Sequence, residues 1–326
     1  MAKPHVVIIS PALANANNGN WQTAWRWSRF LRQDYKVTLA VQWDGTPCDA
    51  MIALHARRSA ASIAAFSAAF PSQPLIVVLT GTDLYKDIRS NAQAQRSLQL
   101  ATHLVVLQTA GLQVLNKDLR RKTQVIYQSA PSLKSRKINP AKPSRYFDVT
   151  MIGHLRAEKD PATFMRAAKS LKLESVRMIH IGSALDPALG QQAENTQRQY
   201  PHYRWLENLP HAATRQRLKR SHLMVIASTM EGGANVICEA ITSGVPVLAS
   251  DISGNRGMLG EKYAGYFAPG DSIKLAQLID RAASDMKFYR RLRAQCAGRA
   301  ALFAPERERA AVIKLLHNSL EMDTHE

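Results

Sequence analysis

Long hydrophobic runs and cysteines are both scarce in this sequence of 326 residues. No apolar run approaches the ~20 residues that a membrane-spanning helix needs, so stable membrane insertion is not expected. The three cysteines, Cys48, Cys238 and Cys296, lack metal-ligand spacing, and their odd number argues against a disulfide framework. No carboxylate pair suggests a bound metal. We therefore expect a cytoplasmic protein without a metal cofactor.

The N-terminal apolar run is also short. It covers about five residues, whereas the apolar region of a signal peptide has ~7–15. A signal peptide is the alternative, but a first buried strand at His5–Ile9 fits the run better.

Acidic residues are few compared with basic ones. There are 25 Asp and Glu against 43 Lys and Arg, which gives a net charge of +18. Such an excess attracts nucleic acid, a lipid surface or small phosphorylated substrates. The sequence has no zinc-ligand spacing, no aromatic-rich RNA signature and no separate basic helix, so a nucleic-acid partner is not expected. No G-x-G-x-x-G follows the first strand, which argues against a nicotinamide cofactor.

Short apolar runs alternate with helical stretches along the whole chain, which predicts α/β domains with parallel sheets. In the first half we expect strands at Asp49–Leu54, Leu75–Leu79, Leu104–Leu107 and Gln124–Tyr127, and helices near Trp21–Arg32, Ser59–Phe70, Ala92–Leu100 and Gly111–Leu115. A stretch rich in proline, serine and basic residues, 131–145, then reads as a linker. After it the alternation restarts, and the tail from Ile273 is mostly helical.

These patterns predict two Rossmann-like domains. The N-terminal domain is expected to cover residues 1–135, the linker residues 136–145, and the C-terminal domain residues 146–326. The sequence leaves open whether the last helix packs back on the N-terminal domain. Ligands of open parallel sheets bind at the carboxyl ends of the strands, so both sheets can face a central cleft. This organisation suits a two-substrate enzyme. A periplasmic-type binding protein is the alternative, against which the lack of an export signal argues.

The segment "STMEGGANVICEAITSGVPVLAS", residues 228–250, carries the strongest chemical signal. Its glycine pair allows a ligand to approach the backbone, and a helix starting near Ala234 offers free N–H groups to a diphosphate. Asn235 and Glu239 are four residues apart and share a helix face. Glu231 precedes the helix, so the two carboxylates can bind hydroxyls on either side of the phosphates. The alternative is two surface glutamates near a helix start, where acids are favoured anyway.

This segment closely resembles the Glu-x7-Glu segment of GT-B glycosyltransferases of family 4. The resemblance implies that Glu231 contacts the donor sugar and Glu239 the ribose. It also implies that the backbone of Gly233, Ala234, Asn235 and Val236 holds the diphosphate of a UDP-sugar, and that no metal is required.

A second stretch, "GHLRAEKDPATFMRAA" at residues 153–168, is similar to the family's strand-to-helix turn. There the family has an arginine and a lysine that neutralise the diphosphate as UDP leaves. Lys159 matches the lysine, but His154 stands where the arginine is expected, and Arg156 is the candidate to supply that charge. A solvated charged turn is the alternative. The stretch "WLENLPH", residues 205–211, resembles the family segment that lies against the nucleotide base.

The N-terminal half resembles a narrower group within the family, the selenosugar synthases of the selenoneine pathway. The likeness includes "WDG", "MIALHARRSAASI", "VVLTGTDLYKDI" and "VIYQSAP". It implies that UDP-N-acetylglucosamine is the donor, that selenophosphate is the acceptor, and that UDP and phosphate are released with a 1-seleno-sugar. A family 4 transferase with a sugar, thiol or lipid acceptor remains the alternative.

A small anionic acceptor needs cations and hydroxyls after the strands of the N-terminal domain. "HARRSA" places His55, Arg57 and Arg58 after one strand, and arginines bind phosphate oxygens in a bidentate manner. Adjacent arginines on a helix point in different directions, so one of them is expected to face the substrate. "TGTD" follows another strand, and the hydroxyls and turn amides of Thr80, Gly81 and Thr82 suit the same anion. Surface charges and a plain helix-capping turn are the alternatives.

The loop before the first helix completes the set of acceptor candidates. It carries Gly19 as its pivot, followed by Asn20. Just beyond lie Trp21, Trp25 and Trp27, for which helix packing is favoured over stacking on a sugar.

Overall fold

The computed structural model of the protein describes residues 3–13, 19–133 and 145–322. The chain divides into two compact units. Unit 1 consists of Met1–Ser129, Glu231–Ala234 and Pro305–Glu326, and unit 2 of Ala130–Met230 and Asn235–Ala304. The predicted linker, 136–145, lies outside the described residues except for its last position. None of the helices in the described ranges combines the length and apolar character that a membrane crossing requires.

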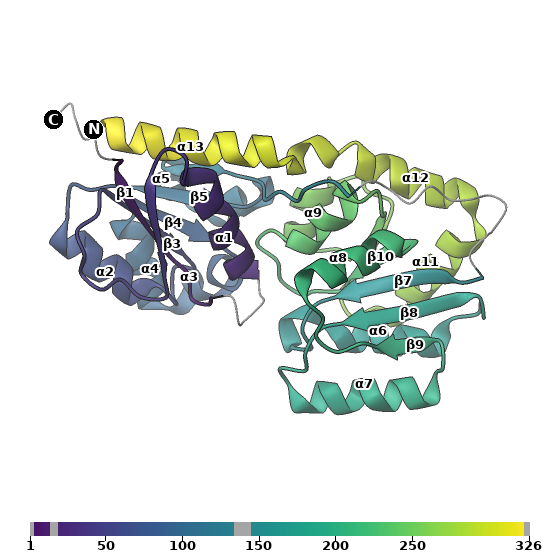
Figure 1. The fold of residues 1–326 in the computed structure, drawn as a ribbon. Coiled ribbons are helices and arrows are strands. Elements are labelled where there is room, and N and C mark those ends of the chain that lie inside the picture. Colours follow the sequence, from purple (N-terminus) through teal and green to yellow (C-terminus); the bar gives the residue numbers. More distant parts are fainter. Residues whose placement is uncertain (1–2, 14–18, 134–144, 323–326) are drawn as a thin grey trace. The chain divides into compact units, whose positions relative to one another are not determined.

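Unit 1 is built on a six-stranded parallel sheet with the strand order β2-β1-β3-β4-β5-β6 (Figure 1). The strands are β1 (His5–Ile9), β2 (Lys36–Ala40), β3 (Ala50–Leu54), β4 (Leu75–Leu79), β5 (His103–Val106) and β6 (Thr123–Val125). Every residue of β3 and β4 is buried, as expected for central strands of a sheet covered on both faces. Strand β1 pairs with β2 on one side and β3 on the other, so the chain changes direction across the sheet here.

Helices cover both faces of this sheet. They are α1 (Gly19–Leu31), α2 (Ala60–Ala69), α3 (Ile88–Ser90), α4 (Ala92–Leu100), α5 (Lys117–Arg121) and α13 (Pro305–Met322), with a π-helical turn η2 (Asp83–Asp87) and a 3-10 turn η3 (Thr109–Val114). Ile63 and Phe66 of α2 pack with the core on one face. Trp27 of α1 packs on the other face together with Leu316 of α13. The C-terminal helix therefore belongs to the core of unit 1.

Unit 2 has a second six-stranded parallel sheet with the order β12-β11-β10-β7-β8-β9 (Figure 1). Its strands are β7 (Phe147–Ile152), β8 (Val176–Ile181), β9 (Tyr203–Trp205), β10 (Leu223–Ile226), β11 (Val247–Ser250) and β12 (Tyr266–Phe267). The first strand, β7, lies between β8 and β10, and so this sheet also has a switch point at its centre. Ligands of open α/β sheets bind outside the carboxyl ends of the strands at such a point.

Among the helices of unit 2, α6 contacts α7 and α11, α11 contacts α12, and α9 contacts α8 and α12. The helical elements are η4 (Ala157–Lys159), α6 (Pro161–Ser170), α7 (Pro187–Gln199), α8 (His211–Arg220), α9 (Asn235–Thr242), α10 (Ser253–Leu259), α11 (Ser272–Ser284), α12 (Met286–Ala297) and η5 (Ala300–Phe303). Helix α9 ends at Thr242, and Gly244 in the turn after it has a left-handed φ of 73°, which costs glycine little.

The predicted elements agree closely with these bounds. The strands expected at His5–Ile9 and Leu75–Leu79 have those limits, and the tail from Ile273 is helical as predicted. The helix expected at Gly111–Leu115 is instead a 3-10 turn that starts at Thr109. The π-helical turn after β4 has no counterpart in the sequence pattern, and it begins and ends at buried aspartates, Asp83 and Asp87.

Candidate active site

The turn that follows β7 carries the candidates for binding a diphosphate. His154 begins this turn, and its Nδ1 accepts a hydrogen bond of 3.1 Å from the backbone N–H of Ser183, which follows β8. Gly182 has a φ of 154°, and a Cβ there would lie 2.0 Å from the carbonyl oxygen of Gly153. The two loops therefore touch through backbone, and only glycine fits at this position. His154 acts in this contact as a hydrogen-bond acceptor, a role that the arginine expected here could not perform.

The two cations of the turn differ in their surroundings. Lys159 lies at the end of η4, and its methylene groups fold back over Gly153, where a Cβ would lie 3.6 Å from Lys159 Cδ. Arg156 and Glu158 are both 40% exposed, and their closest charged atoms are 3.9 Å apart. Such a loose, exposed pair contributes little to stability and leaves the guanidinium able to turn to another anion.

A backbone hydrogen bond connects the β7 turn to the loop after β10. The N–H of Thr229 donates to the carbonyl oxygen of Glu158 at 3.0 Å. Strands β7 and β10 are neighbours in the sheet, so the two loops leave the same edge side by side. The turn that carries Lys159 and the beginning of the loop that leads to α9 therefore lie side by side at the switch point of this sheet.

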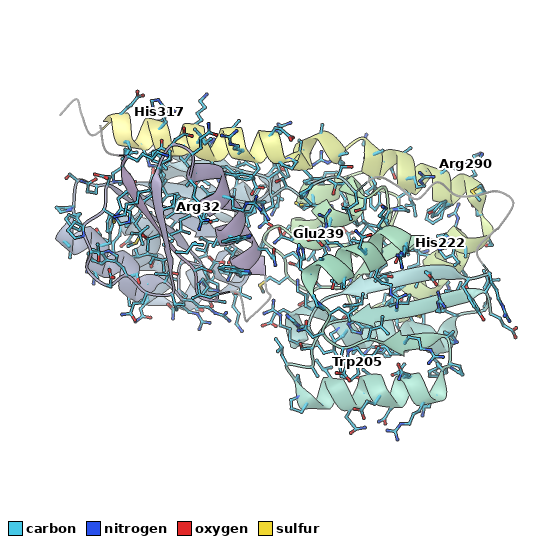
Figure 2. The ribbon with its side chains drawn as sticks, viewed as in Figure 1. Arg32, Trp205, His222, Glu239, Arg290 and His317 are labelled. Atoms are coloured by element: carbon cyan, nitrogen blue, oxygen red, sulfur yellow. The ribbon has the colours of Figure 1, made fainter. Side chains whose placement is uncertain are left out.

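Helix α9 begins at Asn235 and carries Glu239 on its buried side (Figure 2). Asn235 and Val236 are partly exposed in the first turn, as a ligand contact requires. The Glu239 side chain is 9% exposed, and its Oε1 lies 2.6 Å from Nε2 of His211, the first residue of α8. The family resemblance of the segment 205–211 predicts that it lies near the nucleotide, but nothing in the sequence singles out His211 within it. The two residues are 28 positions apart, so no local spacing could reveal the pair.

The loop Glu231–Ala234 belongs by its contacts to unit 1. A Cβ on Gly232 would lie 2.5 Å from the carbonyl oxygen of Thr80, and one on Gly233 would lie 2.5 Å from Leu107 Cβ. The glycine pair is thus required by close packing against the segments that follow β4 and β5. Glu231 is buried in the same loop, with 8% of its surface exposed.

His55 lies at the carboxyl end of β3 in an unusual backbone conformation. Its φ of 72° is left-handed, which is rare for a residue other than glycine and marks a strained position. The ring is buried, Nε2 lies 2.9 Å from the Thr82 hydroxyl oxygen, and Nδ1 accepts from the backbone N–H of Arg58 at 3.4 Å. Burial lowers the pKa of His55, although the carboxylate of Asp83 opposes the shift. The structure brings His55 and Thr82 together as the predicted set requires.

The turn Thr80–Asp83 is organised around the carboxylate of Asp83, which is fully buried. Its Oδ1 accepts from the N–H of Thr80 at 2.9 Å and of Gly81 at 2.8 Å, and its Oδ2 accepts from the N–H of Ala56 at 3.0 Å. The expectation that the Thr80 and Gly81 amides would bind a substrate anion is therefore wrong. Each amide has one hydrogen, and the buried carboxylate already holds it.

The adjacent arginines lie in the turn before α2 and not on a helix, and their surroundings differ. Arg57 Nε lies 3.0 Å from Asp87 Oδ2, and Asp87 is buried in the π-helical turn. The Arg58 guanidinium is exposed and makes no ion pair or side-chain hydrogen bond with the part of the chain that the structure describes. Arg58 is thus the better candidate to meet an anionic substrate. Asp87, which the sequence pattern did not single out, forms an ion pair with Arg57.

Gly19 and Asn20 form the first turn of α1, and neither is buried. The tryptophans that follow are divided between two roles. Trp27 is fully buried, which confirms packing for this residue. Trp21 and Trp25 instead stack on each other with ring centroids 5.5 Å apart, and Trp25 is 37% exposed.

No group of His, Cys, Asp and Glu side chains within the described ranges could hold a metal ion. A cavity of about 650 Å³ opens beside β8 and β9, where Arg177, Arg204 and Tyr146 contribute to its lining. One lining residue, Leu206, belongs to the segment 205–211 that resembles the nucleotide-binding stretch, and the lining includes none of Lys159, Glu231 and Glu239.

Comparison with known proteins gives a family match and a fold match. The model of the family described as "Glycosyl transferases group 1" matches residues 134–299, which is just over half of the chain. The chain is 29% identical over 133 residues to "Glycosyltransferase 1 domain-containing protein 1" of Xenopus tropicalis. That alignment covers 40% of this chain and 39% of the curated relative, so it spans about two fifths of the relative's length.

Two solved structures are similar over nearly the whole chain. Alr3699/HepE of Anabaena, solved in complex with UDP-glucose, has a TM-score of 0.73 at 16% identity and covers 98% of this chain and 99% of its own. Sucrose-phosphate synthase of Thermosynechococcus elongatus has a TM-score of 0.78 at 15% identity, covering 98% of this chain and 100% of its own. Together with the two parallel sheets, this likeness confirms the predicted GT-B fold.

Proposed function

Because the chain belongs to the glycosyl transferases group 1 family, we propose that it transfers a sugar from a UDP-sugar to a small anionic acceptor. The observation that carries this proposal is the hydrogen bond of 3.0 Å between Thr229 and Glu158. It joins the turn that carries Lys159 to the beginning of the loop that leads to α9. HepE, a protein of the same fold, was solved with UDP-glucose, which supports a UDP-sugar as the donor.

In the proposed reaction the bond between sugar C1 and the diphosphate oxygen breaks with help from charge in unit 2. Lys159, Arg156 and the N-terminal end of α9 stabilise the negative charge that develops on UDP. Glu239 binds the ribose, and Glu231 binds the donor sugar. The backbone of Gly233, Ala234, Asn235 and Val236 lies along the diphosphate.

For the acceptor we propose selenophosphate, with UDP-N-acetylglucosamine as the donor. Selenium attacks C1, a carbon–selenium bond replaces the carbon–oxygen bond, and UDP leaves. Hydrolysis of the selenium–phosphorus bond by water then gives phosphate and 1-seleno-N-acetylglucosamine. Arg58 is the cation proposed to hold the acceptor's phosphoryl group, since the structure leaves its guanidinium exposed while Arg57 is paired with Asp87. The Thr80 and Thr82 hydroxyls are proposed to complete the acceptor site.

One observation favours a different acceptor. The amides of Thr80 and Gly81 are held by Asp83, so unit 1 offers an anion fewer donors than the sequence suggested. The stacked pair of Trp21 and Trp25 at the start of α1 gives a partly exposed aromatic surface of the kind on which a sugar ring stacks. A sugar, thiol or lipid acceptor is therefore the second candidate.

The experiment is incubation of the purified protein with selenophosphate and, in turn, UDP-N-acetylglucosamine, UDP-glucose and UDP-galactose. Mass spectrometry of the products and release of UDP are measured. We expect a selenium-containing hexosamine, and a loss of turnover of about 100-fold in Lys159→Ala, since a charge at the leaving group acts in the transition state. Glu231→Ala is expected to abolish the product, and Lys169→Ala, an exposed lysine on α6, is the matched control.

The possible outcomes separate the two candidates. UDP release that needs a sugar or thiol, and not selenophosphate, would favour the second acceptor class. Turnover at the wild-type rate in both Lys159→Ala and Glu231→Ala would contradict the assignment of the site itself.

A further inference from the structure

The contact between His211 and Glu239 connects two helices of unit 2 at the edge where the donor is proposed to bind. We propose that His211 is a positioning residue for the donor nucleotide. It holds one oxygen of Glu239 and thereby directs the other toward the ribose hydroxyls. This inference rests on the proposed function, since it concerns the same donor site.

The position of His211 is fixed by the packing of α8. Thr214, Arg215 and Leu218 are all buried, and they lie three, four and seven residues after His211 on one helix face. Arg215 also donates from Nη2 to the carbonyl oxygen of Pro131 at 2.6 Å, which ties the second turn of α8 to the rest of the unit. His211 is the first residue of the helix on this anchored face. The packing of α8 therefore fixes the position of His211 beside α9.

The two carboxylate oxygens of Glu239 have different environments. Oε1 accepts from His211 Nε2 at 2.6 Å, whereas Oε2 makes no hydrogen bond or ion pair to any residue that the structure describes. The terminal torsion of a glutamate is broad, so a carboxylate without a partner can turn freely. With Oε1 fixed by the imidazole, Oε2 keeps one direction and is available to accept from a hydroxyl.

The exposure of the pair agrees with a role in ligand binding. The Glu239 side chain is 9% exposed and that of His211 is 41% exposed, so the pair lies at the margin of the core rather than inside it. A buried carboxylate that serves architecture uses both oxygens within the protein. A site built to accept hydrogen bonds from hydroxyls discriminates strongly against a ligand that lacks them, because its polar groups are then left unpaired.

The experiment compares binding of UDP and of 2′,3′-dideoxy-UDP, which lacks both ribose hydroxyls, by calorimetry. We expect His211→Ala to weaken UDP about tenfold and to leave the dissociation constant of dideoxy-UDP within twofold of the wild-type value. In turnover, KM for the donor should rise about tenfold with kcat unchanged. His211→Gln, whose amide can donate to Oε1, should restore most of the UDP affinity. Gln216→Ala, at an exposed position of α8, is the matched control.

A double mutant gives a second measurement. If His211 acts through the carboxylate, Glu239→Ala should weaken UDP, and adding His211→Ala to it should cause no further loss. Additive losses would contradict the proposal, as would equal weakening of UDP and dideoxy-UDP by His211→Ala. Should His211→Ala unfold, His211→Gln and His211→Asn replace it. His211→Asn, with the shorter side chain, should lose UDP affinity selectively, and failure to do so overturns the proposal. Absence of UDP binding by the wild-type protein would instead refute the proposed function.

Discussion

Two buried carboxylates of unit 1, those of Asp83 and Glu308, and the carboxylate of Glu239 on α9 of unit 2 are used in different ways. Asp83 in unit 1 accepts three backbone hydrogen bonds through its two oxygens. Glu308, also in unit 1, accepts from Arg26, Trp27 and Ser129 with both oxygens occupied. Glu239 in unit 2 has one oxygen on His211 and the other without a partner in the described chain.

The difference shows how to separate architecture from binding among buried acids. A carboxylate whose oxygens are all taken by the protein stabilises the fold and can do little else. A carboxylate with one oxygen that no protein group occupies can still accept hydrogen bonds from water or from a ligand. On this criterion Asp83 and Glu308 build unit 1, and Glu239 is available to a ligand.

The largest effect is expected at Asp83. Asp83→Ala leaves three buried N–H groups without an acceptor, each at a cost of about 1–3 kcal/mol, so we expect a loss of about 3–5 kcal/mol in the free energy of unfolding of unit 1. Urea denaturation of the whole chain measures it. Asp83→Asn keeps one oxygen for Thr80 and Gly81 and should lose less than half as much. A loss below about 1 kcal/mol in Asp83→Ala would show that the carboxylate is not structural.

A somewhat smaller loss of stability is expected on substitution of Glu308, which connects α13 by hydrogen bonds to α1 and to Ser129. Its Oε2 lies 2.6 Å from Arg26 Nε and 2.7 Å from the backbone N of Ser129. Glu308→Gln removes the negative charge and places an amide N–H, which can only donate, next to groups that also donate. We therefore expect a loss of about 2–3 kcal/mol in the free energy of unfolding. Faster hydrogen exchange along α13 is the measurement. Glu306→Gln, exposed in the first turn of the same helix, is the control and should leave the exchange unchanged.

The smallest effect tests a buried base rather than an acid. His180 on β8 is fully buried against Tyr203, and burial lowers its pKa to about 4. The unfolded chain has a histidine pKa of about 6.5 and binds the proton first as the pH falls. The stability due to neutral His180 is therefore complete above pH 6.5 and is lost as the pH falls from there toward 4.

The expected loss from this group is about 2 kcal/mol between pH 8 and pH 5. Urea denaturation at a series of pH values measures it. His180→Asn, which cannot titrate, should show a flatter dependence over this range. An equally steep dependence in that variant would assign the acid sensitivity to other groups.

Local pattern was enough to predict much of the fold. Continuous apolar runs gave β1 and β4 their bounds, because a strand buried on both faces needs no polar positions. The shared helix face of Asn235 and Glu239 could also be predicted, because it depends only on residues about one turn apart. The tryptophans of α1 were harder. Packing was predicted for the group, but only Trp27 is fully buried, because α13 covers one side of the helix.

The candidate site was predicted less completely, for a reason of distance along the chain. The partner of Glu239, His211, is 28 residues away in the chain. The Asp83 carboxylate accepts from the N–H groups of Thr80 and Gly81, and also from that of Ala56, which follows a different strand. Whether an amide is available to a ligand depends on what else is folded against it. The sequence shows only that the amide exists.

The sequence by itself determined the alternation of strands and helices, the two parallel sheets and the segment that begins α9, because these follow from periodicity and from residues close in the chain. Tertiary structure alone decided which polar groups remain available. Hydrogen bonds from other parts of the chain occupy both carboxylate oxygens of Asp83 and of Glu308, but only one oxygen of Glu239. An oxygen that already accepts hydrogen bonds within the fold gains little from a ligand.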